Sequence, residues 1–412
     1  MKFMTSIIKR LKQLDLLIIL LLIFFLIMEK KNVMFLAIFG ALLVGCSEEE
    51  IANVETSSQN AISFNVVSNA AETKATPITP SNLKTGNVDF DVFAYTVKDG
   101  TAFMGDTKED YFHKGVKIVY KGTDNDGKWD YDDQTELRYW PTEALNFYAV
   151  SPGTVLAGDA GLHYTWNFNK DKQEITYACM NEYAEGTGKH SDHDVMYGIA
   201  LNQTKTSNNG VVRFKFKHIL SQVVFKAKTE LTTMNVTINS IKIHNAKMTG
   251  TFTLPSDAET APSTADNWVL AGMEDGTGYY DPVIIRDKTI EVNSNTTDIS
   301  CETPIFTIPQ TLTKWSVDGD TKTIAKADGV RQSYLEISCN IQQSGVYLFG
   351  SAGEYKTIYV PFGASWEPGK RYVYTMIFGG GYDANGDEIL KPIEFDAKVE
   401  DWGDDVESNV TF

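Results

Sequence analysis

Apolar and polar residues alternate along much of the chain after residue 60. Ile62, Phe64 and Val66 are separated by polar neighbours, and the same period of two recurs over residues 88–97 and 212–217. A period of two places the apolar side chains on one face of a strand and the polar side chains on the other. The pattern therefore predicts half-buried strands of antiparallel sheets.

Similar segments fill the rest of the chain, and Gly, Asn and Asp residues typical of turns separate them. No long apolar pattern has helical spacing, so the sequence predicts an all-β chain, best explained as two β-sandwich domains in series. The polar residues 205–210 predict the boundary, with an N-terminal sandwich at 61–209 and a C-terminal one at 210–412. The other predicted strands are 116–120, 145–150, 166–168, 236–243, 251–254, 304–308, 334–341, 358–360, 371–378 and 393–399.

Two apolar runs precede the strands, at residues 16–28 and 33–44. Each is shorter than the roughly 18 residues that a membrane-spanning helix needs, although two membrane helices are the alternative. The second run follows basic residues after Met28 and ends in Leu43-Val44-Gly45-Cys46, which is typical of a lipoprotein signal peptide. The sequence predicts a signal peptide region at 1–45 with its true start at Met28, lipidation of Cys46, and a polar tether at 46–60.

The formal net charge of −17 over 412 residues makes the chain acidic. An acidic surface argues against binding to nucleic acid or to an anionic membrane, because both attract basic patches. Beyond Cys46 the chain has three cysteines, Cys179, Cys301 and Cys339. Cys301 and Cys339 could form a disulfide, and the alternative is three buried apolar thiols.

Motifs for catalysis or phosphate binding are missing from the sequence, which predicts no enzyme and no cofactor. His190, Asp192, His193 and Asp194 form the densest zinc-like cluster, but a solvated loop is the favoured interpretation. Residues 122–133 and 383–394 resemble calcium loops. Each lacks a residue that a calcium loop requires at a fixed position. We therefore predict that both segments are hairpin turns. We therefore expect no metal site.

Several motifs, in their order along the chain, resemble the fimbrillin family of Gram-negative surface lipoproteins, in its Mfa-like branch of type V pilus subunits. They are the lipobox with acidic residues after it, Ile62-Ser63-Phe64 followed by Thr73-Lys74-Ala75, Tyr139-Trp140-Pro141, Phe147-Tyr148-Ala149-Val150-Ser151-Pro152, Asp194-Val195-Met196-Tyr197, Phe216-Lys217-His218-Ile219-Leu220-Ser221-Gln222, Ile308-Pro309-Gln310-Thr311, Trp366-Glu367-Pro368-Gly369-Lys370, and Ile393-Glu394-Phe395 with Asp401-Trp402.

This resemblance implies two transthyretin-like β-sandwich domains in an outer-membrane surface lipoprotein of the fimbrium. In polymerising members a protease cuts after a basic residue behind the first strand, and a strand from the next subunit replaces that strand. Here the displaced strand would be Ile62, Phe64 and Val66, and the processed bond Lys74-Ala75. The family's usual basic residue is Arg, so a lysine on an uncleaved subunit is the alternative.

Other fimbrial subunits, the outer membrane through a lipid anchor, and a host or bacterial surface receptor are the expected partners. The C-terminal residues 406–412 could donate a strand, although Ser408 interrupts their apolar period. A glycan-binding surface lipoprotein is the alternative function. It would use exposed aromatic residues from the 7 Trp and 19 Tyr of the chain, which also suit a sandwich core.

Overall fold

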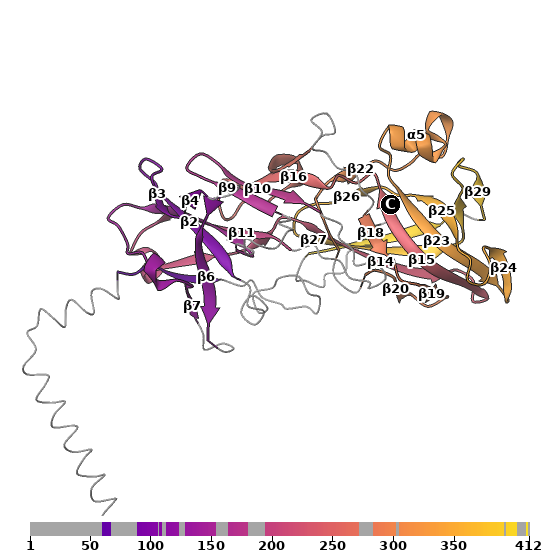
Figure 1. The fold of residues 1–412 in the computed structure, drawn as a ribbon, viewed down its shortest axis with the longest axis horizontal. Helices are drawn as coiled ribbons and strands as arrows, with labels where there is room; N and C mark the ends of the chain where they lie inside the picture. The colour runs from indigo at the N-terminus through magenta and orange to yellow at the C-terminus, as the bar shows by residue number, and fades with distance from the viewer. Residues whose placement is uncertain are drawn as a thin grey trace, which may run out of the picture. The chain divides into compact units, whose positions relative to one another are not determined.

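The structure of the chain is a computed structural model. It describes residues 60–66, 89–105, 107–108, 113–122, 128–153, 164–179, 194–271, 283–301, 305–390, 393–401 and 409–410. Nearly all of its regular structure is strand, which confirms the predicted all-β class (Figure 1). Residues 62–412 form one compact unit. None of the described helices is long and apolar enough to cross a membrane, and both N-terminal apolar runs lie outside the described residues.

A nine-stranded sheet holds the first strand of the described chain. Its order is β12-β1-β7-β6-β2-β8-β11-β13, and β3 pairs with β2. The bounds are β1 (Ser63–Val66), β2 (Phe90–Thr96), β3 (Ala102–Met104), β6 (Val116–Lys121), β7 (Lys128–Tyr131), β8 (Leu145–Ser151), β11 (Met196–Gln203), β12 (Val211–Phe214) and β13 (Lys217–His218).

Two larger sheets form the second half of the chain. The six-stranded sheet contains β14 (Ser221–Thr229), β20 (Thr297–Asp298), β21 (Ile305–Thr307), β27 (Lys370–Phe378), β30 (Glu394–Asp401) and β31 (Asn409–Val410). The eight-stranded sheet contains β15 (Met234–His244), β18 (Val283–Arg286), β19 (Ile290–Val292), β23 (Tyr334–Gln343), β24 (Val346–Phe349), β25 (Lys356–Pro361), β28 (Gly381–Tyr382) and β29 (Glu388–Ile389). Apolar residues of both sheets share one buried cluster, as in a β-sandwich.

A four-stranded sheet combines strands from both halves of the sequence. β9 (Tyr164–Phe168) and β10 (Gln173–Ala178) pair with β16 (Thr249–Thr253) and β17 (Trp268–Leu270), through β10 and β16. The predicted domain boundary at residues 209/210 stays a prediction. The remaining short elements are β4 (Thr107–Lys108), β5 (His113–Lys114), β22 (Thr311–Leu312), β26 (Ala364–Ser365), α4 (Thr264–Asn267), α5 (Ile324–Gly329) and the 3-10 turns Gln134–Glu136, Ser207–Gly210 and Gly319–Thr321.

The predicted segment 212–225 is divided among three strands, β12, β13 and β14. Val212 and Phe214 belong to the core cluster around β1, whereas Ile219 and Val223 belong to the larger cluster, which combines residues from both halves of the sequence. The chain therefore passes from one core to the other at residues 215–220. The prediction of an antiparallel strand at 212–217 is wrong, because β12 pairs with β1 in parallel. Parallel pairing needs a long connection, and the residues between these strands supply it.

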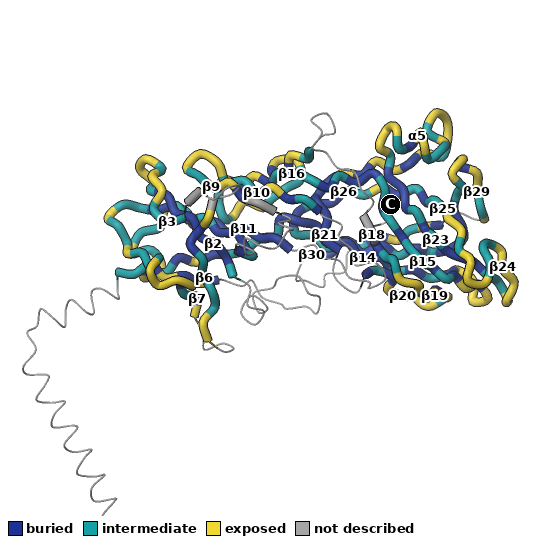
Figure 2. The backbone as a smooth tube through the Cα atoms, in the orientation of Figure 1, coloured by how far each residue is buried: buried dark blue, intermediate teal, exposed yellow. Residues whose placement is uncertain are grey.

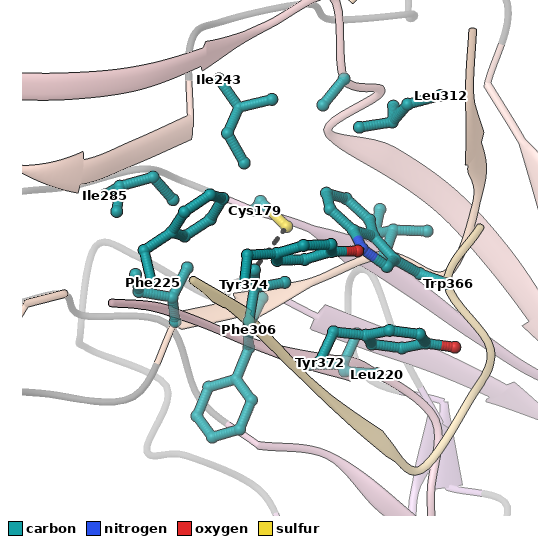
Figure 3. Packing of buried hydrophobic residues seen from close by; sticks show 14 of the residues in the cluster. Cys179, Leu220, Phe225, Ile243, Ile285, Phe306, Leu312, Trp366, Tyr372 and Tyr374 are labelled. Atoms are coloured by element: carbon teal, nitrogen blue, oxygen red, sulfur yellow. Dashed lines mark hydrogen bonds between the residues drawn. The ribbon is translucent and has the colours of Figure 1, made fainter. Parts of the chain in front are cut away.

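Buried residues run along the strands and exposed residues collect at the hairpins (Figure 2). Figure 3 shows part of the larger core cluster, where the Phe225 and Tyr374 rings lie 5.3 Å apart. The indole Nε1 of Trp366 donates a hydrogen bond to the Tyr374 hydroxyl over 3.0 Å. This bond satisfies a donor that would otherwise be buried without a partner.

The structure has Cys179, Cys301 and Cys339 as buried thiols. Cys179 Sγ lies 4.0 Å from the carbonyl oxygen of Phe306, and the Cys301 thiol donates to the carbonyl oxygen of Ile285 over 2.8 Å. Of the two interpretations of these residues, the structure supports buried thiols and not a disulfide between Cys301 and Cys339.

Candidate functional site

The first strand, β1, has the alternation that its sequence predicts. The fractional exposures of Ile62, Phe64 and Val66 are 1%, 5% and 8%, whereas Ser63 and Asn65 between them are exposed. Each apolar side chain that is fully buried stabilises the folded state by about 1.5–3 kcal/mol relative to an exposed one. The three side chains thus hold β1 in place from one face only.

β1 lies inside the sheet, between two strands that come much later in the sequence. It runs parallel to β12, with Phe64 opposite Val212, and antiparallel to β7, with Phe64 opposite Trp129. The Ile62 amide donates a hydrogen bond to the carbonyl oxygen of Arg138 over 2.9 Å. Removing β1 would therefore leave backbone donors and acceptors of β12 and β7 facing an empty position.

Phe64 is the centre of an aromatic cluster. Its ring is stacked on Phe214, with centroids 6.3 Å apart and an interplanar angle of 7°. Tyr131, Phe147 and Phe90 meet it edge-on at 5.6, 6.3 and 6.5 Å. Burial raises the pKa of the Tyr131 hydroxyl, so this ring stays neutral. The position of Phe64 thus suits a neutral side chain of aromatic size.

These features describe a short strand whose position could accept another strand. Main-chain hydrogen bonds bind an added strand, and pockets for alternate side chains select it. β1 uses both kinds of contact and has only four residues. The predicted processing site, Lys74 and Ala75, and the predicted lipidation site, Cys46, lie outside the described residues.

Comparison with known families decides which kind of protein has this architecture. The model of a family described as fimbrillin-like matches residues 73–402, which is more than half of the chain. The chain belongs to the fimbrillin-like family. The family match begins after β1, and it covers all of the strands that surround β1.

Individual relatives of this fimbrillin-like chain are more distant. A curated fimbrium subunit, Fim1C of Phocaeicola vulgatus, is 25% identical over 205 residues, 48% of this chain and 50% of that protein. The chain thus spans about half the length of this curated relative. A crystal structure of a fimbrial protein from Bacteroides vulgatus has a TM-score of 0.53 at 17% identity, covering 83% of this chain and 99% of that one. A putative cell adhesion protein from Bacteroides uniformis has a TM-score of 0.42 at 13% identity, covering 83% and 98%.

Both calcium-like segments of the fimbrillin-like chain belong to hairpins. β6 and β7 pair antiparallel around the first segment, whose residues 123–127 lie outside the described part. In the second, between β28 and β29, Asp383 Oδ1 accepts hydrogen bonds from the amides of Asn385 and Asp387 at 2.8 and 2.9 Å. These bonds lower the pKa of Asp383, the amide of Asp387 most, while Lys322 Nζ lies 2.6 Å from Asp387 Oδ1. In this second segment two antiparallel strands are joined by a turn whose hydrogen bonds lie within the turn itself, which confirms the hairpin prediction.

The zinc-like cluster is only partly described. His190, Asp192 and His193 lie outside the described residues, and Asp194 Oδ2 lies 2.9 Å from Nδ1 of His218. Within the part of the chain that the structure describes, no group of three or more His, Cys, Asp or Glu side chains could hold a metal ion.

Exposed aromatic side chains bear on the glycan-binding alternative. Among the large hydrophobic residues that are described and exposed, two are aromatic, Tyr139 and Tyr347. Tyr139 follows β7 in the sequence, whereas Tyr347 lies in β24 of the eight-stranded sheet. The exposed aromatic side chains that the structure describes thus come from two different parts of the fold.

The sequence alone did not identify the residues that enclose β1. Trp129 and Tyr131 of β7 lie within the calcium-like segment 122–133, for which a hairpin turn is predicted, although Lys128-Trp129-Asp130-Tyr131 itself alternates. This alternation was the available signal. Phe214 was predicted to be buried, but no local pattern could indicate that it stacks on Phe64.

Proposed function

We propose that this fimbrillin-like chain is a non-enzymatic fimbrial subunit or surface adhesin lipoprotein that assembles with other fimbrial subunits by exchange of its first strand. The observation that carries the proposal is the position of β1. It is a four-residue strand between β12 and β7, held by Ile62, Phe64 and Val66 in an aromatic core. Loss of this strand would open an acceptor position with hydrogen-bonding edges on both sides.

In the proposed sequence of events, a protease cuts the Lys74-Ala75 bond on the cell surface. The peptide that carries β1 then dissociates, because β1, the strand that the structure describes in this peptide, has four residues. A strand of a neighbouring subunit enters between β12 and β7 and places an apolar, preferably aromatic, side chain where Phe64 lay. The incoming strand regains the main-chain hydrogen bonds and the burial of three alternate side chains.

The C-terminal residues 406–412 are the proposed donor. Asn409–Val410 form β31, which pairs with Lys398 and Ala397 of β30. A donor strand must leave this pairing before it enters a neighbouring subunit. Because the described part of this segment pairs with β30 at two residues, we expect that exchange to be favourable.

Lipidation of Cys46 would place the subunit on the outer membrane, and the cut at Lys74 would release it. The lipid and β1 lie on the same side of this bond in the sequence. One cleavage would therefore free the folded subunit from its anchor and open the β1 position. Without cleavage, the chain would stay on the surface as an anchored monomer.

The test is mass spectrometry and gel electrophoresis of the protein shed from cells that express the full chain. We expect an N-terminus at Ala75 and heat-stable ladders of multimers. Lys74→Gln should abolish both, whereas Lys84→Gln, a lysine in the same segment, should leave them unchanged. Recovery of intact, lipidated monomer alone from the unmodified chain would contradict the proposal.

A further inference from the structure

Gly198 lies in the middle of β11, a strand that contributes to the core cluster around β1. Met196 and Ala200, two residues away on either side, belong to the same buried cluster as Phe64. Because alternate residues of a strand share one face, Gly198 also faces this core. Its φ lies outside the left-handed region, so the backbone itself would accept alanine. Glycine inside a strand often marks a place where another group approaches closely.

The group that approaches Gly198 is the ring of Phe214. A Cβ added at Gly198 would lie 2.9 Å from Cδ1 of Phe214 and 3.2 Å from its Cβ. A carbon at 2.9 Å overlaps the ring, since favourable carbon contacts lie at about 3.5–4.0 Å. The residue beside Gly198 in register is Ala149 of β8, which is small and fully buried in the same cluster. This part of the core thus has little side-chain volume, and Phe214 lies against it.

Phe214 links Gly198 to the β1 position. It is fully buried, and its strand, β12, pairs with β1. One neighbour of its ring is Phe64, stacked at 6.3 Å, and two others are Phe90 and Phe216, each at 5.9 Å. Close-packed interiors transmit a shift of this kind and do not absorb it. A displacement of Phe214 away from β11 would therefore reach the rings around it, Phe64 among them.

We propose that Gly198 sets the size of the side chain that the β1 position accepts at its centre. With glycine at residue 198, Phe214 lies close to β11 and leaves room for an aromatic ring where Phe64 lies. A side chain at residue 198 would move Phe214 toward β1, and leucine would then fit better than phenylalanine. Gly198 acts through Phe214 and is therefore a positioning residue of the acceptor.

An acceptor of this shape selects strands by their central side chain, in a subunit that exchanges β1 as proposed above. A strand with an aromatic residue between two smaller apolar residues fills the space that Ile62, Phe64 and Val66 occupy. A strand with alanine or valine at its centre would leave a cavity next to Phe214. One methylene more or less in an apolar pocket changes selection about 10–200-fold. The selection of a partner thus rests on the proposed exchange, whereas the packing is a property of the uncleaved chain.

The test is a double-mutant cycle between residues 198 and 64 in the uncleaved chain from residue 46 onward, with Cys46→Ser to prevent lipidation. Because residue 64 is varied within the chain itself, the measurement needs neither cleavage nor a second subunit. Hydrogen exchange at the Ile62 amide, which donates to the carbonyl oxygen of Arg138, gives the opening constant of β1. Urea unfolding gives the stability of the whole chain.

Gly198→Ala should raise the opening constant of β1 about tenfold, because the extra carbon overpacks the core beside this strand. In the unmodified chain Phe64→Leu should also raise the opening constant, because the aromatic ring is lost. In the Gly198→Ala background the same replacement should leave the opening constant unchanged or lower it. The two replacements should thus be coupled about tenfold, which is about 1.4 kcal/mol.

Two control variants accompany the cycle. Gly250 lies in β16 of the four-stranded sheet, and a Cβ there would lie 3.1 Å from the ring of Trp268. Gly250→Ala should lower the urea midpoint without coupling to residue 64, because it crowds a ring of a different core cluster. Phe216→Leu truncates another neighbour of Phe214 that lies outside β1. It should not relieve the effect of Gly198→Ala on β1.

Three outcomes would overturn the proposal. They are an unchanged opening of β1 in Gly198→Ala, additive effects of Gly198→Ala and Phe64→Leu, and relief by Phe216→Leu as large as that by Phe64→Leu. If Gly198→Ala prevents folding, the double variant with Phe64→Leu should fold, and its failure would also count against the proposal. The expected coupling together with a missing multimer ladder would support the role of Gly198 while contradicting the exchange.

Discussion

Replacing Phe64 with Ala removes the side chain on which the packing of β1 is centred. The ring is 5% exposed and contacts Phe214, Tyr131, Phe147 and Phe90. Truncation leaves a cavity among four rings, which belong to one buried cluster and have little room to collapse.

Phe→Ala replacements in protein cores cost about 3–5 kcal/mol. We expect about 4 kcal/mol for Phe64→Ala, which changes the equilibrium for docking of β1 by roughly three powers of ten. Asn65→Ala is the matched control, because Asn65 lies in the same strand with its side chain exposed. Its replacement should change stability by no more than about 0.5 kcal/mol.

Urea unfolding followed by tryptophan fluorescence measures the effect, because Trp129 of β7 lies opposite Phe64. Hydrogen exchange at the Ile62 amide, which bonds to Arg138, reports the opening of β1 directly. If Phe64→Ala and Asn65→Ala have the same small effect on both measurements, then β1 is not held by its buried face. The proposed acceptor position would then have no energetic basis.

Other measurements test different parts of the structure. Burial raises the pKa of Cys339 to about 12, so this thiol should resist alkylation at pH 8 until the chain is unfolded, which mass spectrometry checks. The hydrogen bond from His244 holds the pKa of Glu336 below its ordinary 4.5. A carboxyl with a lowered folded pKa stabilises the fold above its unfolded pKa. That stability is lost as pH falls through the lowered value, so the melting temperature should fall less between about pH 5 and pH 3 in Glu336→Gln than in the unmodified chain. Gly350→Ala should cost at least about 1 kcal/mol in urea unfolding, because the new Cβ meets Glu354 at positive φ; an unchanged midpoint would contradict that contact.

Local alternation was sufficient to predict the strands that have one buried face. β1, β15 and β23 lie where the period of two predicts them, because alternate burial is a property of the strand itself. β24 is the exception. Its four apolar residues have no alternation, and an apolar run of this kind is typical of a buried strand, yet three of them are exposed.

Pairing between distant strands could not be predicted. The parallel partner of β1 is β12, and β14 pairs in parallel with β27. The residues of a single strand do not indicate either pairing. Each pairing depends on the core in which both strands bury their apolar side chains. For the candidate site, the sequence predicted the buried face of Ile62, Phe64 and Val66. It did not predict the aromatic residues around that face, which come from four other strands.

The place of β1 in its sheet has a consequence for how the chain is made. Phe64 pairs with Trp129 and Val212, which follow it by about 65 and about 150 residues in the sequence. Pairing at such sequence separation is slow and comes late in folding. We therefore expect the more local pairings of β7 with β6 and of β6 with β2 to form before β1 docks between β7 and β12. A chain in that order of folding would have, before β1 docks, the same open position that the proposed exchange with a second subunit would use.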